Sequence, residues 1–420
     1  MRKLIVLAAL PLAAACTEIT TLKQENPGQL DASGLYVPRN AQLLVNGVIA
    51  DFECAFSRYV FGTALFTDEL TNSFSGSNNI DYDRRTLTSN APYGNQVCNA
   101  SQTAPIYTTL SIARANGDTV AARLESWSDA DVPNRQKLIA QSYLYAGYAL
   151  TLLGEAMCSA AINVGPELTP QQLFTEAKTR FDKAVAAATT ANDAAVLNLA
   201  LLGRARTLLD LGDKAGAGAD AAKIPAGFVA NISTDASNVR RQNYVFLGVN
   251  QSQWASVDPS FRGLTVNGVP DPRVAVTNTN RPSTVPGVVI WTPDKYTGLG
   301  STMPLARYAE AQFIVAESKL AANDIAAAVA AINIVRAARS IAPYDASGQT
   351  QAQVLAQLQE ERRRELFLEG HRLGDLRRYG LPILPLAGTP FVSGGVYGTQ
   401  TCFPLPDVER INNPNIGSGT

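Results

Sequence analysis

The sequence predicts a mainly α-helical protein, built as a scaffold of helical repeats with long loop insertions and few short strands. Three features lead to this fold class. A spaced apolar pattern recurs along the chain, and alanine is abundant while aromatic residues make up only 7%. Two long polar stretches rich in Pro, Gly, Asn and Ser interrupt the helical segments. Small side chains allow helices to pack closely, and 46% apolar residues are ample for a core.

The first residues have the pattern of an export signal. Arg2 and Lys3 form a short basic segment, and residues 4–15 are apolar apart from Pro11. This run ends in three alanines directly before Cys16. A basic start, an apolar stretch of this length and small residues at a cleavage site are typical of secreted proteins. The run is too short for a permanent membrane helix, which needs about 20 residues.

Cys16 follows the small residues in an arrangement that resembles the lipobox of bacterial lipoproteins. The resemblance implies that residues 1–15 are a lipoprotein signal peptide and that Cys16 is lipidated. Leu12 departs from the usual pattern, because it stands four residues before the cysteine instead of three. Membrane attachment would then depend on acyl chains alone. The alternative is an ordinary signal peptide, which would leave a soluble periplasmic protein.

Four further cysteines predict two disulfides, since an even number in an exported protein is typical of paired thiols. They are Cys54, Cys98, Cys158 and Cys402. Three pairings are possible, and the sequence does not choose among them. We favour Cys54–Cys98, which closes a local loop, and Cys158–Cys402, which ties the tail to the body. No zinc site is expected, because the chain has no Cys-x-x-Cys and only one histidine.

Charge and motifs argue against several classes of function. Lys plus Arg number 35 and Asp plus Glu number 36, so no electrostatic attraction to nucleic acid is expected. The chain has no Gly-rich phosphate loop, no Gly-x-Ser-x-Gly and no His-Glu-x-x-His. We therefore expect neither a cofactor nor catalysis. Paired catalytic carboxylates stay open, because such residues need not be adjacent in sequence.

The helical repeats are predicted from a pattern of a large residue, a small residue three positions later, and a third contact four positions further on. It occurs three times, always before a turn: Leu144-Gly147-Thr151, Leu202-Ala205-Leu209 and Phe313-Ala316-Leu320. Partner helices follow Pro170 and Asp324. The pattern resembles tetratricopeptide repeats without their full consensus. It predicts repeat helices over about 135–225 and 305–380.

The rest of residues 16–420 is expected to complete a single domain. Residues 38–60 and 101–125 are predicted to be helical, the second interrupted near Gly117. Two stretches, about 68–100 and 231–305, are too long and polar to be turns in a compact domain, so we interpret them as functional insertions. The tail, 381–420, is Pro- and Gly-rich and is expected to be mostly irregular.

The most specific motif lies near the C-terminus. Thr350 and Gln353 form a capping box that opens a helix, and a charged string follows over residues 360–380. This string resembles the signature of SusD/RagB-type outer-membrane lipoproteins. The matching residues are Glu361, Arg362, Arg363, Glu365, Leu366, Glu369, Gly370, Arg372, Asp375, Leu376, Arg378 and Gly380. Segments 307–310, 316–320, 403–409 and 413–415 also resemble the family.

We interpret this signature as structural. Arginine forks paired with carboxylates can fix how two helices cross. Burial of such charges is costly unless each is paired, so they are expected to form one network. The residues concerned are Glu361, Arg362, Arg363, Glu365, Arg372, Asp375 and Arg378. His371, the only histidine, is expected to be a packing residue.

The resemblance implies a surface protein of the outer membrane that captures nutrients. Members of the family cap a SusC-type TonB-dependent transporter and deliver oligosaccharides, or in some branches peptides, without catalysis. Outward orientation is implied by the family alone, because only one acidic residue, Glu18, closely follows Cys16. Two alternatives remain: a lipid-anchored helical-repeat adaptor that binds proteins but no small ligand, and a surface glycan hydrolase.

Ligand contacts are expected in the two insertions. Sugars stack apolar C–H faces on aromatic rings and offer hydroxyls to amide and charged side chains. Candidates with this chemistry are Trp254, Trp291, Tyr296, Tyr82, Asn78 and Asn79. The alternative for each aromatic residue is a place in the core.

Overall fold

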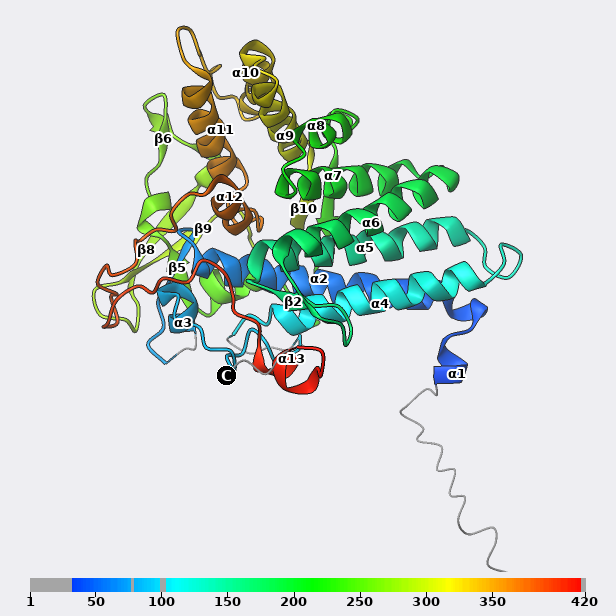
Figure 1. Ribbon diagram of the computed structural model, residues 1–420. Helices are drawn as coiled ribbons and strands as arrows, with labels where there is room; N and C mark the ends of the chain where they lie inside the picture. Colours follow the sequence, from blue (N-terminus) through cyan, green and yellow to red (C-terminus); the bar gives the residue numbers. More distant parts are fainter. Residues whose placement is uncertain (1–31, 77–78, 99–102, 417–420) are drawn as a thin grey trace, which may run out of the picture.

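The computed structural model describes residues 32–76, 79–98 and 103–416 (Figure 1). The predicted signal peptide, Cys16 and Asn78 lie outside these ranges. Helices account for most of the ordered elements, which confirms the mainly helical fold class. Within the described ranges, no helix combines the length and apolarity needed to cross a bilayer.

The helices and strands are short relative to the chain, and only α2 exceeds 25 residues. The helices are α1 (Ala32–Leu35), α2 (Ala41–Phe66), α3 (Asn79–Arg84), α4 (Tyr107–Ser126), α5 (Arg135–Ala156), α6 (Pro170–Thr190), α7 (Ala194–Asp210), α8 (Lys214–Ala221), α9 (Tyr308–Ala321), α10 (Ile325–Ala338), α11 (Gln351–Glu365), α12 (Arg372–Tyr379) and α13 (Asp407–Asn412). The strands are β1 (Leu70–Asn72), β2 (Ala160–Ala161), β3 (Glu167–Leu168), β4 (Val229–Ile232), β5 (Ala255–Val257), β6 (Thr265–Val266), β7 (Val269–Pro270), β8 (Val276–Pro282), β9 (Val289–Pro293) and β10 (Met303–Arg307). They pair into two-stranded antiparallel ladders: β1–β5, β2–β3, β4–β10, β6–β7 and β8–β9.

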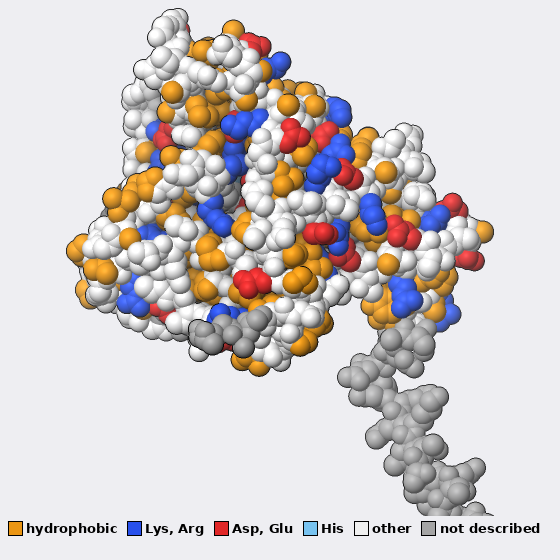
Figure 2. Space-filling view, in the orientation of Figure 1, with side chains coloured by type: hydrophobic (Ala, Val, Ile, Leu, Met, Phe, Trp, Pro, Cys, Tyr) orange, Lys and Arg blue, Asp and Glu red, His pale blue; other side chains and the backbone are white. Residues whose placement is uncertain are grey.

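Helices α4 to α10 pack in series, each against the next (Figure 1). Side-chain caps set several of their starts: Thr169 and Gln172 form a capping box at α6, and Asp193, Asp213 and Asp324 cap α7, α8 and α10. Figure 2 shows Lys and Arg interspersed with Asp and Glu over the repeat helices, without a large area of one sign on this face. Positive and negative side chains, which are nearly equal in number in the sequence, are therefore also mixed on this face of the molecule.

The repeat pattern corresponds to close helix crossings. Phe181 of α6 is fully buried and lies against Gly147 of α5 and Gly203 of α7. A Cβ atom at Gly203 would lie 2.5 Å from the Phe181 ring, and one at Gly147 would lie 3.0 Å from it. Tyr148 packs edge-on against the same ring, with centroids 5.1 Å apart. Small residues opposite a large one thus let three helix axes approach.

Helices α9, α10 and α11 enclose a second, smaller apolar cluster. Phe313, Ala316 and Leu320 of α9 pack there with Ile332 of α10 and Leu358 of α11. These α9 residues are the third occurrence of the repeat pattern. The recurrence at unequal intervals therefore reflects two repeat regions separated by the second insertion.

Helix α2 forms the centre of the main core. Every residue from Phe52 to Phe66 is buried, which explains its almost continuous apolar sequence. Helix α4 packs against α2 and α5 and runs unbroken from Tyr107 to Ser126. The expected interruption at Gly117 is wrong. Gly117 serves packing instead, because a Cβ there would lie 2.8 Å from the Ser142 carbonyl oxygen of α5.

Both disulfides have the favoured pairing. Cys54 of α2 bonds Cys98, and Cys158, after α5, bonds Cys402 of the tail. Beside the second bond, Phe403 packs its ring 4.6 Å from Phe66 and 5.4 Å from Tyr93. The tail is largely irregular as predicted, and these contacts hold it on the core.

Candidate ligand-binding surface

The two polar insertions meet in space and form one surface. Strand β1 of the first insertion pairs with β5 of the second. The Ser73 hydroxyl donates to the Gln253 carbonyl at 2.7 Å, and the Ser75 N–H donates to the Thr284 hydroxyl at 2.9 Å. We call the exposed parts of residues 73–76, β8 and β9, together with Arg262, the insertion surface. Two segments about 180 residues apart in sequence therefore build it jointly.

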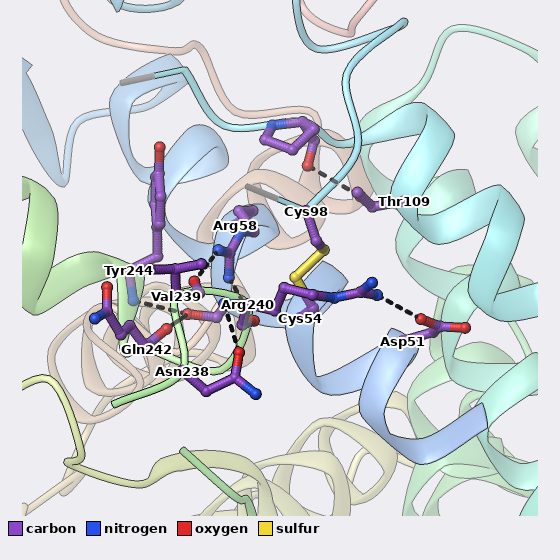
Figure 3. Close-up of a disulfide and its surroundings, with 12 residues drawn as sticks. Asp51, Cys54, Arg58, Cys98, Thr109, Asn238, Val239, Arg240, Gln242 and Tyr244 are labelled. Atoms are coloured by element: carbon purple, nitrogen blue, oxygen red, sulfur yellow. Dashed lines mark hydrogen bonds and ion pairs between the residues drawn. A yellow bond between two sulfur atoms is a disulfide. The ribbon is translucent and has the colours of Figure 1, made fainter. Parts of the chain in front are cut away.

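Helix α2 anchors the second insertion from beneath (Figure 3). The fully buried Arg58 guanidinium donates to the carbonyl oxygens of Val239 at 2.9 Å and Arg240 at 3.1 Å. It also lies 4.8 Å from the centroid of the Tyr244 ring. Burial lowers the pKa of Arg58 to about 10, so the side chain stays charged at neutral pH. The Cys54–Cys98 bond leaves the same helix one turn earlier and fixes the first insertion.

A buried carboxyl group holds β1 at the surface. Asp83 of α3 accepts hydrogen bonds from the Asn72 N–H at 2.6 Å and the Thr71 hydroxyl at 2.9 Å. Burial raises the pKa of Asp83 to about 7, although these two bonds oppose the rise. The carboxyl therefore fixes the edge of β1 in both of its protonation states.

The β8–β9 hairpin presents the one half-exposed tryptophan of the insertions. Trp291 of β9 lies opposite Asn278 of β8 in the ladder. Its N–H donates to the Ser256 hydroxyl at 2.8 Å, which links β9 to β5. The Arg262 guanidinium lies 5.4 Å from the centroid of the Trp291 ring, within the range of a cation–π contact. An indole ring thus lies beside an amide and a guanidinium at the molecular surface.

Strand β8 adds exposed polar side chains to this arrangement. Its sequence alternates Thr and Asn, and Thr277, Asn278, Asn280 and Arg281 are exposed. The ladder shifts register between Asn278 and Pro282, and Asn280 has a positive φ of 55°. An irregular edge strand of this kind resists pairing with a further strand. The Asn278 Oδ1 atom accepts a hydrogen bond from the Asn280 N–H at 2.8 Å, and the exposed amide NH2 groups of Asn278 and Asn280 can donate to a ligand hydroxyl.

The other candidate residues lie in the core. Trp254 is 9% exposed and packs 6.0 Å from Tyr244. The hydroxyl of Tyr296 donates to the Leu368 carbonyl at 2.9 Å, and that of Tyr82 donates to the Ala104 carbonyl at 2.7 Å. Asn79 is buried at the start of α3. None of these four side chains can offer a ring face or an amide to a ligand in this structure, so Trp291 is the one candidate within the described residues that lies at the surface, while Asn78 lies outside them.

Sequence reasoning missed Arg262, Asn278 and Asn280. The alternation of side chains along a strand could have predicted the exposure of Trp291. Ile290 and Thr292 are buried, and Trp291 between them is turned toward the surface. The Thr-Asn alternation of β8 is likewise typical of an exposed edge strand. Among the described residues, no group of three or more His, Cys, Asp or Glu side chains is placed to hold a metal ion.

The signature residues form ion pairs, partly among themselves and partly with residues of other elements. Arg362 donates to both carboxyl oxygens of Asp375 at 2.9 Å, and Arg372 donates to Asp68 at 2.6 and 2.7 Å. Further pairs join Arg378 to Glu317 and to Asp375, Arg307 to Glu365 and to Glu369, Arg273 and Arg336 to Glu361, and Arg363 to Glu360. Cations close by hold the pKa of Asp375 below its usual range against the effect of burial.

His371 lies within this network and does not point to a ligand. Its side chain is buried, and Nε2 lies 3.3 Å from Arg206 Nη2. Burial, followed by the charges of Arg206 and Arg362, lowers the pKa of His371 well below 6.5. The ring is therefore neutral at physiological pH and acts as a packing and hydrogen-bonding group.

Comparison with known proteins identifies related sequences and folds. A sequence model of the SusD family matches residues 235–411. The fold is similar to that of a SusD-like carbohydrate-binding protein from Bacteroides vulgatus, with 15% identity, 90% of this chain and 97% of the other covered, and a TM-score of 0.68. A SusD-superfamily protein from Bacteroides fragilis is similar at 14% identity, covering 91% and 99%, with a TM-score of 0.70. One from Parabacteroides distasonis has 13% identity, 93% and 100% coverage, and a TM-score of 0.67. No curated protein matches the chain in sequence.

Proposed function

We propose that the chain, whose residues 235–411 match the SusD family model, is a member of that family, and that it captures nutrients at the insertion surface and delivers them to a SusC-type TonB-dependent transporter. The ligand class that the surface fits best is an oligosaccharide, with a peptide as the second possibility. In this proposal the protein is a binding protein without catalytic activity, anchored in the outer membrane through lipidated Cys16 and facing the exterior.

The observation that carries the proposal is the composition of the insertion surface. The Trp291 indole ring and several exposed amide and hydroxyl groups lie on the β8–β9 hairpin, and the Arg262 guanidinium lies beside the indole ring. An aromatic face takes the apolar side of a pyranose ring, while amide and guanidinium groups bond its hydroxyls. The related protein from Bacteroides vulgatus is described as carbohydrate-binding, which supports the same ligand class here.

The geometry also bears on specificity. The Arg262 guanidinium already contacts the Trp291 ring and donates to the Val257 carbonyl at 2.9 Å through Nε. Burial lowers the pKa of Arg262, yet the group stays charged at neutral pH. A ligand that stacks on the ring therefore meets a fixed cation, which favours sugars that carry a carboxylate or several vicinal hydroxyls.

Titration of a glycan and peptide panel tests the proposal. Binding should be found for at least one glycan, and Trp291→Ala should weaken it by about 1–3 kcal/mol, the usual loss for a desolvated aromatic anchor. Trp127→Ala is a matched control, because Trp127 is another half-buried tryptophan that packs against the main core, at the end of α4. It should leave affinity unchanged.

Two outcomes would contradict the proposal. If both tryptophan variants bind as the wild type does, the insertion surface is not the site. If no glycan or peptide binds while a soluble protein partner does, the helical-repeat adaptor is the better account.

A further inference from the structure

A small chamber lies where the signature helices meet the repeat helices. Its walls come from α5, α7 and α9 on the repeat side and from α11, α12 and His371 on the signature side. It leaves about 10 Å³ for the centre of a water-sized molecule, which is about the room that one water needs. The chamber is therefore large enough for a single small occupant and too small for a nutrient.

Two arginines on opposite walls use their guanidinium groups in the same way. Arg206 of α7 donates through Nε and Nη2 to Glu310, at 2.7 and 3.0 Å. Arg362 of α11 donates through Nε and Nη2 to Asp375, both at 2.9 Å. The Nη1 atom of each arginine is buried and has no hydrogen-bond partner among the described residues. A buried N–H without an acceptor destabilises the folded state, because the group has lost its hydrogen bonds to water.

A buried hydrogen-bond acceptor without a partner also lines this chamber. The Asp210 side chain is 6% exposed, and its Oδ2 atom is buried with no hydrogen-bond partner within the described part of the chain. The other oxygen, Oδ1, lies 4.0 Å from Arg378 Nε, beyond hydrogen-bond distance. Two donors and one acceptor without partners thus belong to residues that line one cavity.

We propose that this chamber is a binding site for one internal water molecule, which accepts hydrogen bonds from Arg206 Nη1 and Arg362 Nη1 and donates one to Asp210 Oδ2. A water molecule has two acceptor and two donor positions, so the three bonds leave one hydrogen for Glu155, another residue of the wall. The water joins α7 of the repeats to α11 of the signature. It bridges two arginines, each of which is already paired with a carboxylate.

The surrounding charges favour water over an anion. Arg206, Arg362 and Arg378 face the chamber, but so do the carboxyl groups of Glu155, Asp210, Glu310 and Asp375. A halide would interact well with the guanidinium groups but would oppose these carboxyls. Water satisfies both sets, because it can donate and accept.

The water can exchange with solvent. A partly open pocket of about 150 Å³ shares Glu155, Asp210, Gly374 and Arg378 with the chamber. Because the two spaces share these wall residues, movement of the Glu155, Asp210 or Arg378 side chain would open a path for a water molecule.

Crystals of the mature chain with both disulfides intact, grown in sodium bromide, test the proposal directly. We expect one oxygen-sized peak of electron density within hydrogen-bond distance of Arg206 Nη1, Arg362 Nη1 and Asp210 Oδ2, without anomalous scattering. An anomalous bromide peak at this position, or no density there, would overturn it.

Oxygen-17 magnetic relaxation dispersion, which counts long-lived internal waters, gives a second test in solution. Asp210→Asn keeps a carbonyl acceptor and should keep the wild-type count. Asp210→Leu, similar in size but apolar, should lose one long-lived water and melt at a lower temperature. Equal counts in all three proteins would overturn the proposal. The crystallographic test needs only the wild type, so it still applies if Asp210→Leu fails to fold.

Discussion

At the scale of single residues, burial separates the side chains that hold the frame from those that can bind a ligand. Arg362 has a side chain that is 4% exposed and bonds both oxygens of Asp375. Trp291 is half-exposed on a hairpin. Both residues belong to polar stretches of the sequence, and only their surroundings distinguish the two roles.

Substitution of Arg362 by alanine should lower stability without affecting binding. It leaves the Asp375 carboxyl buried with one cation fewer, and breaking one partner of a buried pair typically costs about 3–5 kcal/mol. Arg240→Ala is the control, because its side chain is 55% exposed and pairs with Asp51 at 2.8 Å. An exposed pair contributes at most about 1 kcal/mol. Thermal melts and ligand titrations on the same proteins decide this. If Arg362→Ala melts normally yet loses binding, the signature is itself the site.

At the scale of elements, the repeat helices depend on glycines at their crossings. Gly203→Ala should destabilise the protein by about 1–3 kcal/mol, because its Cβ would lie 2.5 Å from Phe181 and 2.8 Å from Tyr148 in a filled core. Gly47→Ala in α2 is the matched control. It is an exposed helical glycine with no heavy atom within 4 Å of a new Cβ, so alanine should stabilise α2 by up to about 1 kcal/mol.

Chemical denaturation of the two variants tests this account. Opposite shifts of the midpoint are expected. If the Gly47→Ala variant is less stable than the wild type, helix propensity does not limit stability at that position. If the Gly203→Ala variant is as stable as the wild type, the close packing at Gly203 is not needed for stability.

The same elements explain what the sequence could predict. The spacings within each helix are local, since Gly147 follows Leu144 and Ala205 follows Leu202 by three residues, so the repeat helices were predictable from periodicity. The insertions were not, because their order arises from distant contacts such as β1 with β5 and Arg58 with residues 239 and 240. Tyr82 and Trp254 have polar neighbours in sequence but apolar neighbours in space, which is why composition misplaced them at the surface.

At the scale of the whole molecule, buried carboxyl groups set the pH dependence of stability. Burial raises the pKa of Glu69, Asp83 and Glu155 to about 7 each, from ordinary values of 4.5, 3.8 and 4.5. The folded state therefore holds protons that the unfolded chain releases. Their stabilising effect is fully present below about pH 4 and is lost as the pH rises through 7.

His371 acts in the opposite direction. Its pKa is lowered well below 6.5, so its effect destabilises the folded protein as the pH falls through 6.5. Three carboxyl groups outweigh one histidine, and the protein should be more stable at pH 6 than at pH 8, by about 1–3 kcal/mol. Melting temperatures at constant ionic strength test this. Glu155→Gln, which keeps an acceptor for the Tyr59 hydroxyl, should flatten the profile. A wild-type profile that is flat or rises toward pH 8 would contradict the assignment.

The central claim is that the whole molecule works as the capture subunit of a transporter. Affinity purification of the tagged full chain from detergent-solubilised membranes, followed by mass spectrometry, tests it most directly. We expect a TonB-dependent outer-membrane receptor to co-purify with the wild type. We expect Cys16→Ser, which lacks the attachment residue, to move to the soluble fraction. Recovery of the wild type from membranes without such a receptor, or with soluble proteins as its only partners, would contradict the claim.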